Sequence, residues 1–440
     1  MTYLDKLIAE HCPEGVPFKT LGEVGKFYGG LSGKSKEDFK DGNAKFITYM
    51  NVFSNISLRV DMPETVKIAP NEKQNTIQYG DVLFTGSSET PDECGMSSVL
   101  TVHTDEKLYL NSFCFGYRFN DPNLVLPGFS KYLFRSEALR KQIKKTASGV
   151  TRFNVSKKKM ESVIIPLPPL EVQSEIVRIL DNFTELTAEL TAELTARQKQ
   201  YEYYRNLLLT FDDAAETIMT DRQTDRQTDR QTDRQTRITE LRRAVKWVTL
   251  GDLAKFTYGY TDKAKDSGEA RFIRITDIGD NGCLLPYDAK YINLTENNKK
   301  YLLHTGDILV ARTGATFGKT LYVPTDDPAV YASFLIKIDL DNSIILNRYY
   351  WHFSKSSIYW NQANKLVSGG GQPQFNSNAL CRVVVPVPSI EEQKRIVSIL
   401  DRFDALCNDI SDGLPAEIEA RQTQYEYYRD KLLSFEKIAS

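Results

Sequence analysis

The 440-residue chain lacks the signatures of secreted and membrane-spanning proteins. Its six cysteines and four histidines are scattered, and their spacing matches neither a disulfide framework nor a zinc site. No apolar run approaches the roughly 20 residues that a membrane-spanning helix needs. We therefore expect a cytoplasmic protein with unremarkable thiols, no bound metal and no membrane segment.

Catalytic motifs are absent as well. Two glycine-rich segments, 28–35 and 313–320, come close to the phosphate-binding loop G-x-x-x-x-G-K-[ST], but Tyr28 and Thr313 stand where its first glycine belongs. A shorter loop aims its backbone N–H groups differently, which argues against nucleotide hydrolysis. The chain also lacks zinc-protease, nucleophile-elbow, dinucleotide-binding and amino-methyltransferase motifs. We predict that it has no catalytic site and binds no cofactor directly.

Overall charge gives no support to nucleic-acid binding, because the formal net charge is only −2. Any basic surface must therefore be local. Segment 131–159 holds ten lysines and arginines and a single acid, Glu137. Such a stretch suits contacts with phosphates, and a solvated helix face is the alternative.

The strongest positive feature is an internal repeat. PLPPLEVQSEIVRILDNF (166–183) matches PVPSIEEQKRIVSILDRF (386–403), and ARQKQYEYYRNLLLTF (196–211) matches ARQTQYEYYRDKLLSF (420–435). Earlier segments pair more loosely, as in TLGEVGKF (20–27) with TLGDLAKF (249–256). The chain is therefore one unit written twice, the first repeat (20–211) and the second repeat (249–435). The C-terminal parts of the two repeats are nearly identical, whereas their N-terminal parts diverge. This pattern suggests that the two repeats recognise different targets and share a common structural framework.

The matching ends read as helices, because apolar residues such as Ile176, Ile179 and Phe183 recur at helical spacing. The first helix is expected from about residue 171 to residue 211, roughly 60 Å at 1.5 Å per residue. Its single apolar stripe needs a partner, and the second copy supplies one in an antiparallel or pseudo-twofold pair. Gly413 and Pro415 should interrupt that second copy and restart it.

The divergent beginnings read as mixed α/β structure. Short β-branched or alternating stretches at 45–50, 81–84, 271–276, 307–311 and 334–338 predict strands, and segments near 128–146 and 347–365 predict helices. Polar and basic side chains on turns between such elements can contact base edges or phosphates. The candidates are Asn51, Ser87, Ser88, Lys144, Lys145, Arg152, Lys157, Lys158, Arg274, Arg312, Thr313, Thr316, Lys319 and Gln372.

Two low-complexity tracts stand out. Residues 184–196 repeat Thr-Ala-Glu-Leu, with leucines that continue the apolar stripe. They form either a plain amphipathic helix or a spacer of adjustable length, because one four-residue unit adds about 6 Å and slightly more than one turn. Residues 220–236 repeat Thr-Asp-Arg-Gln without an apolar residue and predict an exposed linker. A tandem GACA tetranucleotide encodes this cycle in every frame, so slippage would shift only the downstream reading frame.

At these residues the chain resembles the DNA-specificity subunits of type I restriction-modification systems. The P-L-P-P-L-E-V-Q and P-V-P-S-I-E-E-Q segments, the paired A-R-Q-x-Q-Y-E-Y-Y-R segments and the Thr-Ala-Glu-Leu tract carry the resemblance. It implies an α+β fold in which two mixed α/β target-recognition domains are joined by two long helices, packed as an antiparallel coiled coil with pseudo-twofold symmetry. The expected segments are 1–165, first recognition domain; 166–212, first helical spacer; 213–241, linker; 242–385, second recognition domain; and 386–440, second helical spacer.

The resemblance also implies partners. Each recognition domain would read one half of a split, asymmetric site on double-stranded DNA. Two modification subunits would carry S-adenosylmethionine and methylate adenine, and restriction subunits would add translocation and cleavage driven by ATP with Mg²⁺. The number of Thr-Ala-Glu-Leu units would set the gap between the half-sites. The helices would bind the modification subunits, with Ile176, Leu180, Phe183, Tyr201, Tyr204, Ile396, Leu400, Phe403, Tyr425 and Tyr428 as the candidate residues.

Two other interpretations stay open at this point. A self-contained restriction enzyme or methyltransferase would need catalytic motifs that the chain lacks. A helical scaffold that never touches DNA would explain the helices, but it would not explain why the beginnings of the repeats diverge. DNA binding with and without a modification subunit separates these interpretations.

Overall fold

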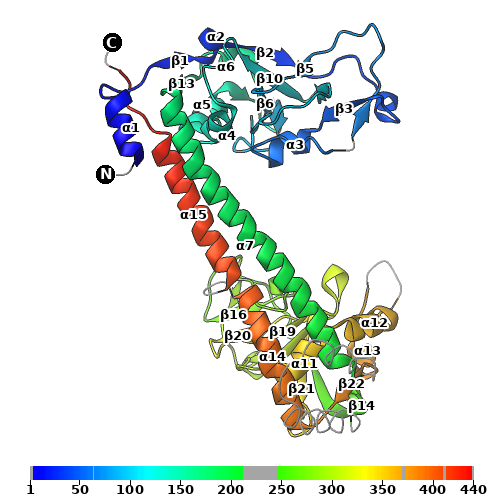
Figure 1. The fold of residues 1–440 in the computed structure, drawn as a ribbon. Coiled ribbons are helices and arrows are strands. Elements are labelled where there is room, and N and C mark those ends of the chain that lie inside the picture. Colours follow the sequence, from blue (N-terminus) through cyan, green and yellow to red (C-terminus); the bar gives the residue numbers. More distant parts are fainter. Residues whose placement is uncertain (1–2, 63, 212–244, 369–372, 410–412, 439–440) are drawn as a thin grey trace, which may run out of the picture. The chain divides into compact units, whose positions relative to one another are not determined.

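The structure is a computed structural model that describes residues 3–62, 64–211, 245–368, 373–409 and 413–438. It divides into two compact units (Figure 1). Unit 1 comprises Met1–Glu189 with Ile418–Ser440, and unit 2 comprises Leu190–Glu417. Each unit therefore holds the divergent part of one repeat and the final helical segment of the other. The predicted linker 213–241 lies outside the described residues.

Unit 1 is built on two sheets. The first has the strand order β2-β10-β6-β8 and is antiparallel throughout. The second has the order β4-β3-β9-β5, in which β3 and β9 are parallel. The strands of these sheets are β2 (Gly25–Gly29), β3 (Ala44–Ile47), β4 (Thr65–Val66), β5 (Thr76–Ile77), β6 (Val82–Thr85), β8 (Ser97–Val99), β9 (Leu108–Leu110) and β10 (Cys114–Phe119).

Smaller elements complete unit 1. A short sheet β11-β12-β7 and a strand pair β1-β13 accompany the two larger sheets. The strands are β1 (Phe18–Thr20), β7 (Ser87–Ser88), β11 (Ala147–Ser148), β12 (Phe153–Val155) and β13 (Ile164–Pro166). The helices are α1 (Tyr3–His11), α2 (Leu21–Val24), the 3-10 helix η1 (Lys36–Phe39), α3 (Tyr49–Ser54), α4 (Pro127–Leu133), α5 (Glu137–Thr146) and α6 (Lys157–Met160).

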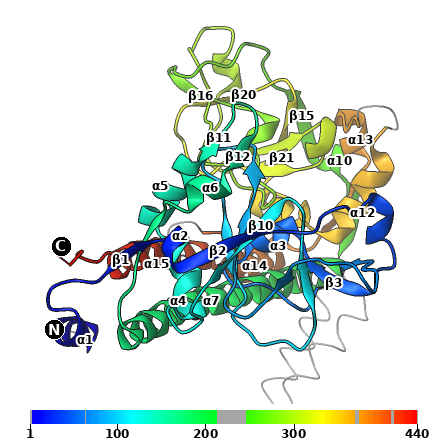
Figure 2. The same cartoon turned by 90° about the horizontal axis from the view of Figure 1, so that it is seen from above.

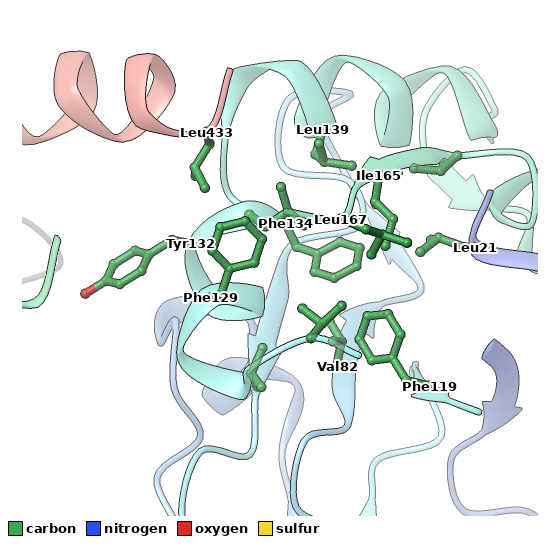
Figure 3. Packing of buried hydrophobic residues seen from close by; sticks show 14 of the residues in the cluster. Leu21, Val82, Phe119, Phe129, Tyr132, Phe134, Leu139, Ile165, Leu167 and Leu433 are labelled. Atoms are coloured by element: carbon green, nitrogen blue, oxygen red, sulfur yellow. The ribbon is translucent and has the colours of Figure 1, made fainter. Parts of the chain in front are cut away.

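The main core of unit 1 lies between the first sheet and helices. Side chains alternate along β6, so that Val82 and Phe84 face this core while Leu83 faces the second sheet. Phe129 of α4 and Leu139 of α5 share this core with Val82, and Leu433 from the second repeat joins them (Figure 3). The first sheet is therefore covered on both faces.

Unit 2 repeats this design. Its sheet β15-β21-β18-β19 corresponds strand by strand to β2-β10-β6-β8. Its sheet β17-β16-β20 corresponds to β4-β3-β9, and β16 and β20 are parallel as β3 and β9 are. The strands are β14 (Lys246–Thr249), β15 (Ala254–Tyr258), β16 (Ala270–Ile273), β17 (Tyr291–Ile292), β18 (Ile308–Ala311), β19 (Thr320–Tyr322), β20 (Ala329–Tyr331), β21 (Leu335–Leu340) and β22 (Val384–Val387).

Each predicted strand stretch overlaps an observed strand, but residues 49–50 and 275–276 were wrongly included, because they lie in α3 and η2. Both predicted helical segments form helices. Each of those segments is a pair of helices with a short break. The helices of unit 2 are α10 (Leu250–Leu253), η2 (Ile275–Asp277), η3 (Lys299–Tyr301), η4 (Gly314–Thr316), α11 (Asn347–Phe353), α12 (Ser357–Leu366), α13 (Ser377–Cys381) and α14 (Ile390–Asn408).

The long helices also agree with the sequence. The helix α7 (Leu170–Thr210) matches the prediction for 171–211 within one residue at each end. In the second repeat, α14 ends at Asn408 and α15 (Leu414–Leu432) restarts with Pro415 as its second residue. The predicted interruption is therefore confirmed. Proline is tolerated there because the first turn of a helix leaves its N–H groups without partners inside the helix.

Within each unit, helices of the two repeats pack side by side. In unit 1, α15 lies against α7, and the rings of Phe183 and Tyr428 stack at 5.4 Å (Figure 1). In unit 2, Phe403 of α14 stacks at 5.4 Å on Tyr204, the repeat equivalent of Tyr428. One turn earlier in α7, the Tyr201 hydroxyl donates to Asp404 Oδ1 at 3.3 Å, one residue later in α14, so the two helices run antiparallel. The same aromatic pair is thus formed twice, each time with one ring from each repeat.

Candidate nucleic-acid interface

In unit 1, polar and aromatic side chains line a hollow of about 360 Å³ beside strand β7. Tyr49 and Met50 of α3, Ser87 of β7, Phe113 and Arg152 are among its lining residues. Met50 and Phe113 expose 59% and 60% of their surface, unusually much for side chains of this size. The same hollow is lined by Glu89 and Glu93. An exposed apolar rim with one cation and two carboxylates beside it indicates a binding surface.

Arg152 is placed there by a hairpin. Strands β11 and β12 are joined by a turn in which Gly149 has a φ of 144°, a conformation that side-chain-bearing residues rarely adopt. A Cβ on Gly149 would lie 1.9 Å from the carbonyl oxygen of Arg152, so only glycine fits. The Arg152 Nε donates to Ser87 Oγ at 3.1 Å, and its guanidinium lies 5.9 Å from the centre of the Phe113 ring.

Unit 2 presents a similar arrangement. Arg312, just after β18, lies with its guanidinium 5.5 Å from the ring of Phe334 and 5.3 Å from that of Tyr258. Its Nε donates to the carbonyl oxygen of Ser333 at 3.0 Å. The two rings expose 50% and 40% of their surface. Both units therefore hold an arginine over an exposed aromatic ring.

Other candidate residues form hydrogen bonds or ion pairs with residues of the chain itself. Asn51 is buried, and its side chain bonds to the backbone N–H and carbonyl of Arg59. Arg274 pairs with Asp277 at 2.7 Å and with Asp288 at 3.2 Å. Sequence position alone does not reveal such internal partners.

The remaining candidates divide in the same way. Ser88 and Thr313 are buried, and Ser88 Oγ donates to Glu93. Thr316 donates to the carbonyl of Thr313, and Lys319 pairs with Asp280. Gln372 lies outside the described residues. For unit 2 this leaves Arg312 as the predicted cation without a carboxylate partner among the described residues.

The basic stretch 131–159 has three kinds of members. Lys131 pairs with Asp181, and Arg135 and Arg140 are held by backbone carbonyls. Lys141 and Lys144 pair with surface carboxylates. The exposed members that have no carboxylate partner in the described part of the chain are Lys145, Arg152, Lys157, Lys158 and Lys159. These five keep their charge available for phosphates.

The ten helix residues predicted to bind partners lie against the chain itself. Ile176, Leu180, Ile396 and Leu400 are fully buried in the cores of their units. The ring of Tyr425 packs edge-on against Tyr132. Phe183, Tyr204, Phe403 and Tyr428 are half-buried and form the stacked pairs, and Tyr201 is buried in unit 2. The outward faces of the same helices carry different residues, including Tyr203 and Tyr427, exposed by 46% and 61%.

A buried polar cluster ties α11 to the helices of unit 2. His352 Nε2 lies 2.8 Å from Asp401 Oδ1, and its Nδ1 lies 3.1 Å from the Tyr201 hydroxyl. Burial lowers the pKa of His352 to about 4, despite the hydrogen bond that the Asp401 carboxylate accepts from the ring. Burial also lowers the pKa of Lys355 to about 8, although Asp404 lies 3.0 Å away. The cluster therefore holds an uncharged histidine at neutral pH.

Acid should destabilise unit 2 through this histidine. The unfolded His352 takes up a proton as pH falls below about 6.5, whereas the folded one resists until about 4. The contribution of His352 to the free energy of unfolding is therefore fully present above pH 6.5. It is lost as the pH falls from 6.5 to 4, which lowers stability by on the order of 1–3 kcal/mol. The variant His352→Gln keeps a donor for Asp401 and should flatten that part of the profile. Thermal unfolding measured across this pH range checks it, and parallel slopes for both proteins would contradict it.

Sequence reasoning missed the aromatic residues that carry these arginines. Phe113 and Phe334 occupy equivalent positions, in N-S-F-C-F (111–115) and A-S-F-L-I (332–336). The backbone carbonyl of Phe113 accepts a hydrogen bond from the N–H of Gly86, the residue after β6. The carbonyl of Phe334 accepts one from the N–H of Arg312, the residue after the equivalent strand β18. The shared S-F pair was the available signal, but an aromatic residue beside a strand predicts a core position.

Comparison with protein families gives a match in both repeats. The model described as type I restriction modification DNA specificity domain matches residues 13–197 and residues 243–420. These two matches cover most of the chain. In the described residues, no helix is long and apolar enough to cross a membrane, and no group of His, Cys, Asp and Glu could hold a metal ion.

Two curated relatives are similar over much of the chain. The putative type I restriction enzyme specificity subunit S.HindORF215P of Haemophilus influenzae is 36% identical over 299 residues, which are 66% of this chain and 68% of that protein. The EcoR124I/EcoR124II specificity subunit of Escherichia coli is 36% identical over 298 residues, 64% of this chain and 65% of that protein. The second alignment thus spans slightly less than two thirds of the relative.

Two solved structures share the fold. The S subunit of a type I restriction-modification system from M. genitalium aligns with a TM-score of 0.54 at 15% identity, covering 95% of this chain and 96% of that one. A chain from a study of complex assembly and conformational transition of the type I R-M system aligns with a TM-score of 0.56 at 18% identity, covering 96% and 98%. At these identities the likeness shows a common architecture.

Proposed function

Because the chain belongs to the type I restriction-modification DNA specificity family, we propose that its two units read the two halves of a split, asymmetric site on double-stranded DNA. The observation that supports the proposal is that both units have the same arrangement of strands, whereas the side chains on their loops differ. Equivalent strands lead to Ser87 in unit 1 and to Thr313 in unit 2, and the nearby arginine comes from a different segment in each. Two surfaces of this kind select two different sequences.

The chain supplies recognition and leaves chemistry to its partners. The P-loop-like segments lack a glycine that the motif requires, and Lys319, the lysine of the second segment, is paired with Asp280. We propose that two modification subunits supply S-adenosylmethionine and methylate the DNA, and that restriction subunits supply cleavage driven by ATP with Mg²⁺. The chain itself binds none of these groups in this proposal.

DNA binding with and without the modification subunit tests the proposal. The purified chain and its complex are each mixed with a pool of randomised duplexes, and the retained sequences are determined. We expect the complex to enrich two short defined sequences separated by a gap of fixed length. A scaffold that brings proteins together without reading DNA would assemble equally well and enrich nothing.

The modification subunits are proposed to bind the outward faces of the helices. Tyr203 and Tyr427 occupy equivalent positions in the two A-R-Q-x-Q-Y-E-Y-Y-R segments and are exposed by 46% and 61%. Each ring packs edge-on against its neighbour, Tyr204 or Tyr428, and leaves its other side open. Tyrosine is favoured at the centres of interfaces because it offers a large rigid ring and a hydroxyl. The pseudo-twofold repeat provides one such site for each of two partners.

Replacing both tyrosines should weaken the complex. In Tyr203→Ala with Tyr427→Ala, we expect affinity for the modification subunit to fall by about 2 kcal/mol or more, the range of interface hot spots. Thermal unfolding should change little, because both rings are exposed. Tyr287→Ala removes a tyrosine of 66% exposure outside the helices and serves as the matched control. Titration calorimetry measures the three affinities, and equal values would contradict this placement of the partners.

A further inference from the structure

The arginines over exposed phenylalanine rings differ from the surface cations of the two units that form ion pairs. Arg274, Lys319 and Lys144 each pair with a carboxylate. For Arg152 and Arg312, no pairing with a carboxylate occurs within the described residues. Each is instead fixed through its Nε, by Ser87 Oγ or by the carbonyl of Ser333, and by the ring beneath it. Such anchoring uses only one of the five N–H groups of a guanidinium.

The two arginines reach this arrangement by different routes. Gly86 N–H bonds to the carbonyl of Phe113, and Arg312 N–H bonds in the same register to the carbonyl of Phe334. Gly86 thus stands where Arg312 stands, so the first repeat has no side chain at that position. Its arginine comes instead from the β11–β12 hairpin. The common result is a cation on an exposed ring, assembled from residues that are not equivalent.

We propose that Arg152 and Arg312 each read a guanine, one in each half of the target site. This inference rests on the proposed function and names the residues that give it specificity. An arginine whose orientation is fixed presents two N–H groups side by side, which match the O6 and N7 acceptors of guanine in the major groove. A phosphate contact needs only a positive charge and would not require the guanidinium to be held against a ring.

Stability alone does not explain the pairs. A cation over an exposed aromatic ring contributes little in water, where both groups are well solvated. Phe113 and Phe334 also leave half or more of their surface exposed. Large apolar side chains exposed beside a cation and away from the core are typical of surfaces that bind a ligand.

The test compares Arg152→Gln with Arg312→Gln, each assembled with the modification subunit and selected on randomised duplexes. In Arg152→Gln, one guanine of the first half-site should become replaceable, and preference for it should fall about tenfold to a hundredfold. The second half-site should stay unchanged. Arg312→Gln should give the mirror result, so each variant is the control of the other. Arg59→Gln, which removes an arginine that is paired with Asp61, should leave both half-sites intact.

The remaining outcomes are decisive as well. If the wild-type complex selects no split site, the proposed function fails. If it does, but neither half contains a guanine read by its arginine, the present inference fails alone. A uniform loss of affinity with an unchanged sequence preference would assign the arginines to phosphates and overturn it. Phe113→Leu and Phe334→Leu change only exposed rings, so they provide a second test of the same inference if the arginine variants fail to fold. They should relax the same guanine positions.

Discussion

Deleting one Thr-Ala-Glu-Leu unit, residues 191–194, should shorten the gap between the two half-sites by one or two base pairs and leave both halves unchanged. The tract is continuous helix within α7, so four residues remove about 6 Å of its length. One base pair of duplex DNA rises about 3.4 Å. Four residues also exceed one helical turn by only about 40°, so the apolar stripe stays on nearly the same face.

The side chains of the tract agree with a spacer. Leu190 and Leu194 are half-buried, whereas Glu185, Glu189 and Glu193 are exposed. Removing a unit therefore replaces one leucine by an equivalent one and deletes no core residue. The wild-type site should lose methylation almost entirely, because the two recognition units then fit a different spacing. Sequencing methylated bases in a host that carries the variant and its modification subunit measures this change.

A substitution that preserves length serves as the control. Glu189→Gln changes a charge within the same tract and should leave the gap as it is. If the shortened chain methylates sites with the original gap, the tract does not determine spacing. The plain amphipathic helix would then be its full explanation.

A half-chain that ends after residue 236, and so holds the first repeat without the second, should form a dimer that reads a palindrome. Unit 1 is completed by the end of the second repeat, from which Tyr425 and Leu433 are buried in its core. The first repeat carries Tyr201 and Leu209 at the matching positions, and both are buried in unit 2. A second copy of the first repeat can therefore complete unit 1 with nearly the same side chains.

Polar contacts also indicate that the end of the first repeat can replace the end of the second repeat in unit 1. The Asp430 side chain accepts a hydrogen bond from Glu137 N at 2.8 Å, at the start of α5 in unit 1. Its equivalent, Asn206, accepts from Ser357 N at 2.9 Å, at the start of α12 in unit 2. Either side chain can fill this role. The half-chain would also be the product of slippage in the tetranucleotide tract, a hypothesis that sequencing of its codons tests.

The half-chain should therefore elute as a dimer and, with the modification subunit, methylate the first half-site repeated in inverted orientation. Leu209→Asp places a charge at a position that is buried in the completed unit and should give monomers without methylation. A wild-type half-chain that stays monomeric, or that methylates the asymmetric site of the full chain, would contradict the exchange.

Sequence patterns predicted the architecture well, because they depend on repetition and periodicity. The limits of α7 and the break before Pro415 follow from apolar spacing and from residues that stop helices. The sequence could not predict which polar side chains form hydrogen bonds inside the fold and are therefore not free to bind DNA. Arg135 and Arg140 read as phosphate contacts in the sequence, but buried carbonyls hold them. Burial depends on tertiary packing, which charge patterns do not contain.

The candidate site shows the same limit. Arg152 and Arg312 were among many polar candidates, and nothing in the sequence set them apart. Phe113 and Phe334 distinguish them, yet an aromatic residue at a strand end usually packs inward. The helix residues predicted to bind partners were chosen for their apolar stripe, which is the face that the chain buries in its own cores. The exposed face, where we propose that the partners bind, carries Tyr203 and Tyr427.

The central claim is that two recognition units read one split site, and methylation sequencing of the wild-type system tests it most directly. A host carrying this gene with its modification subunit is sequenced at single-molecule level. The account predicts one methylated motif, made of two different short sequences separated by a gap of fixed length. A continuous motif, or none at all despite an active modification subunit, would contradict it.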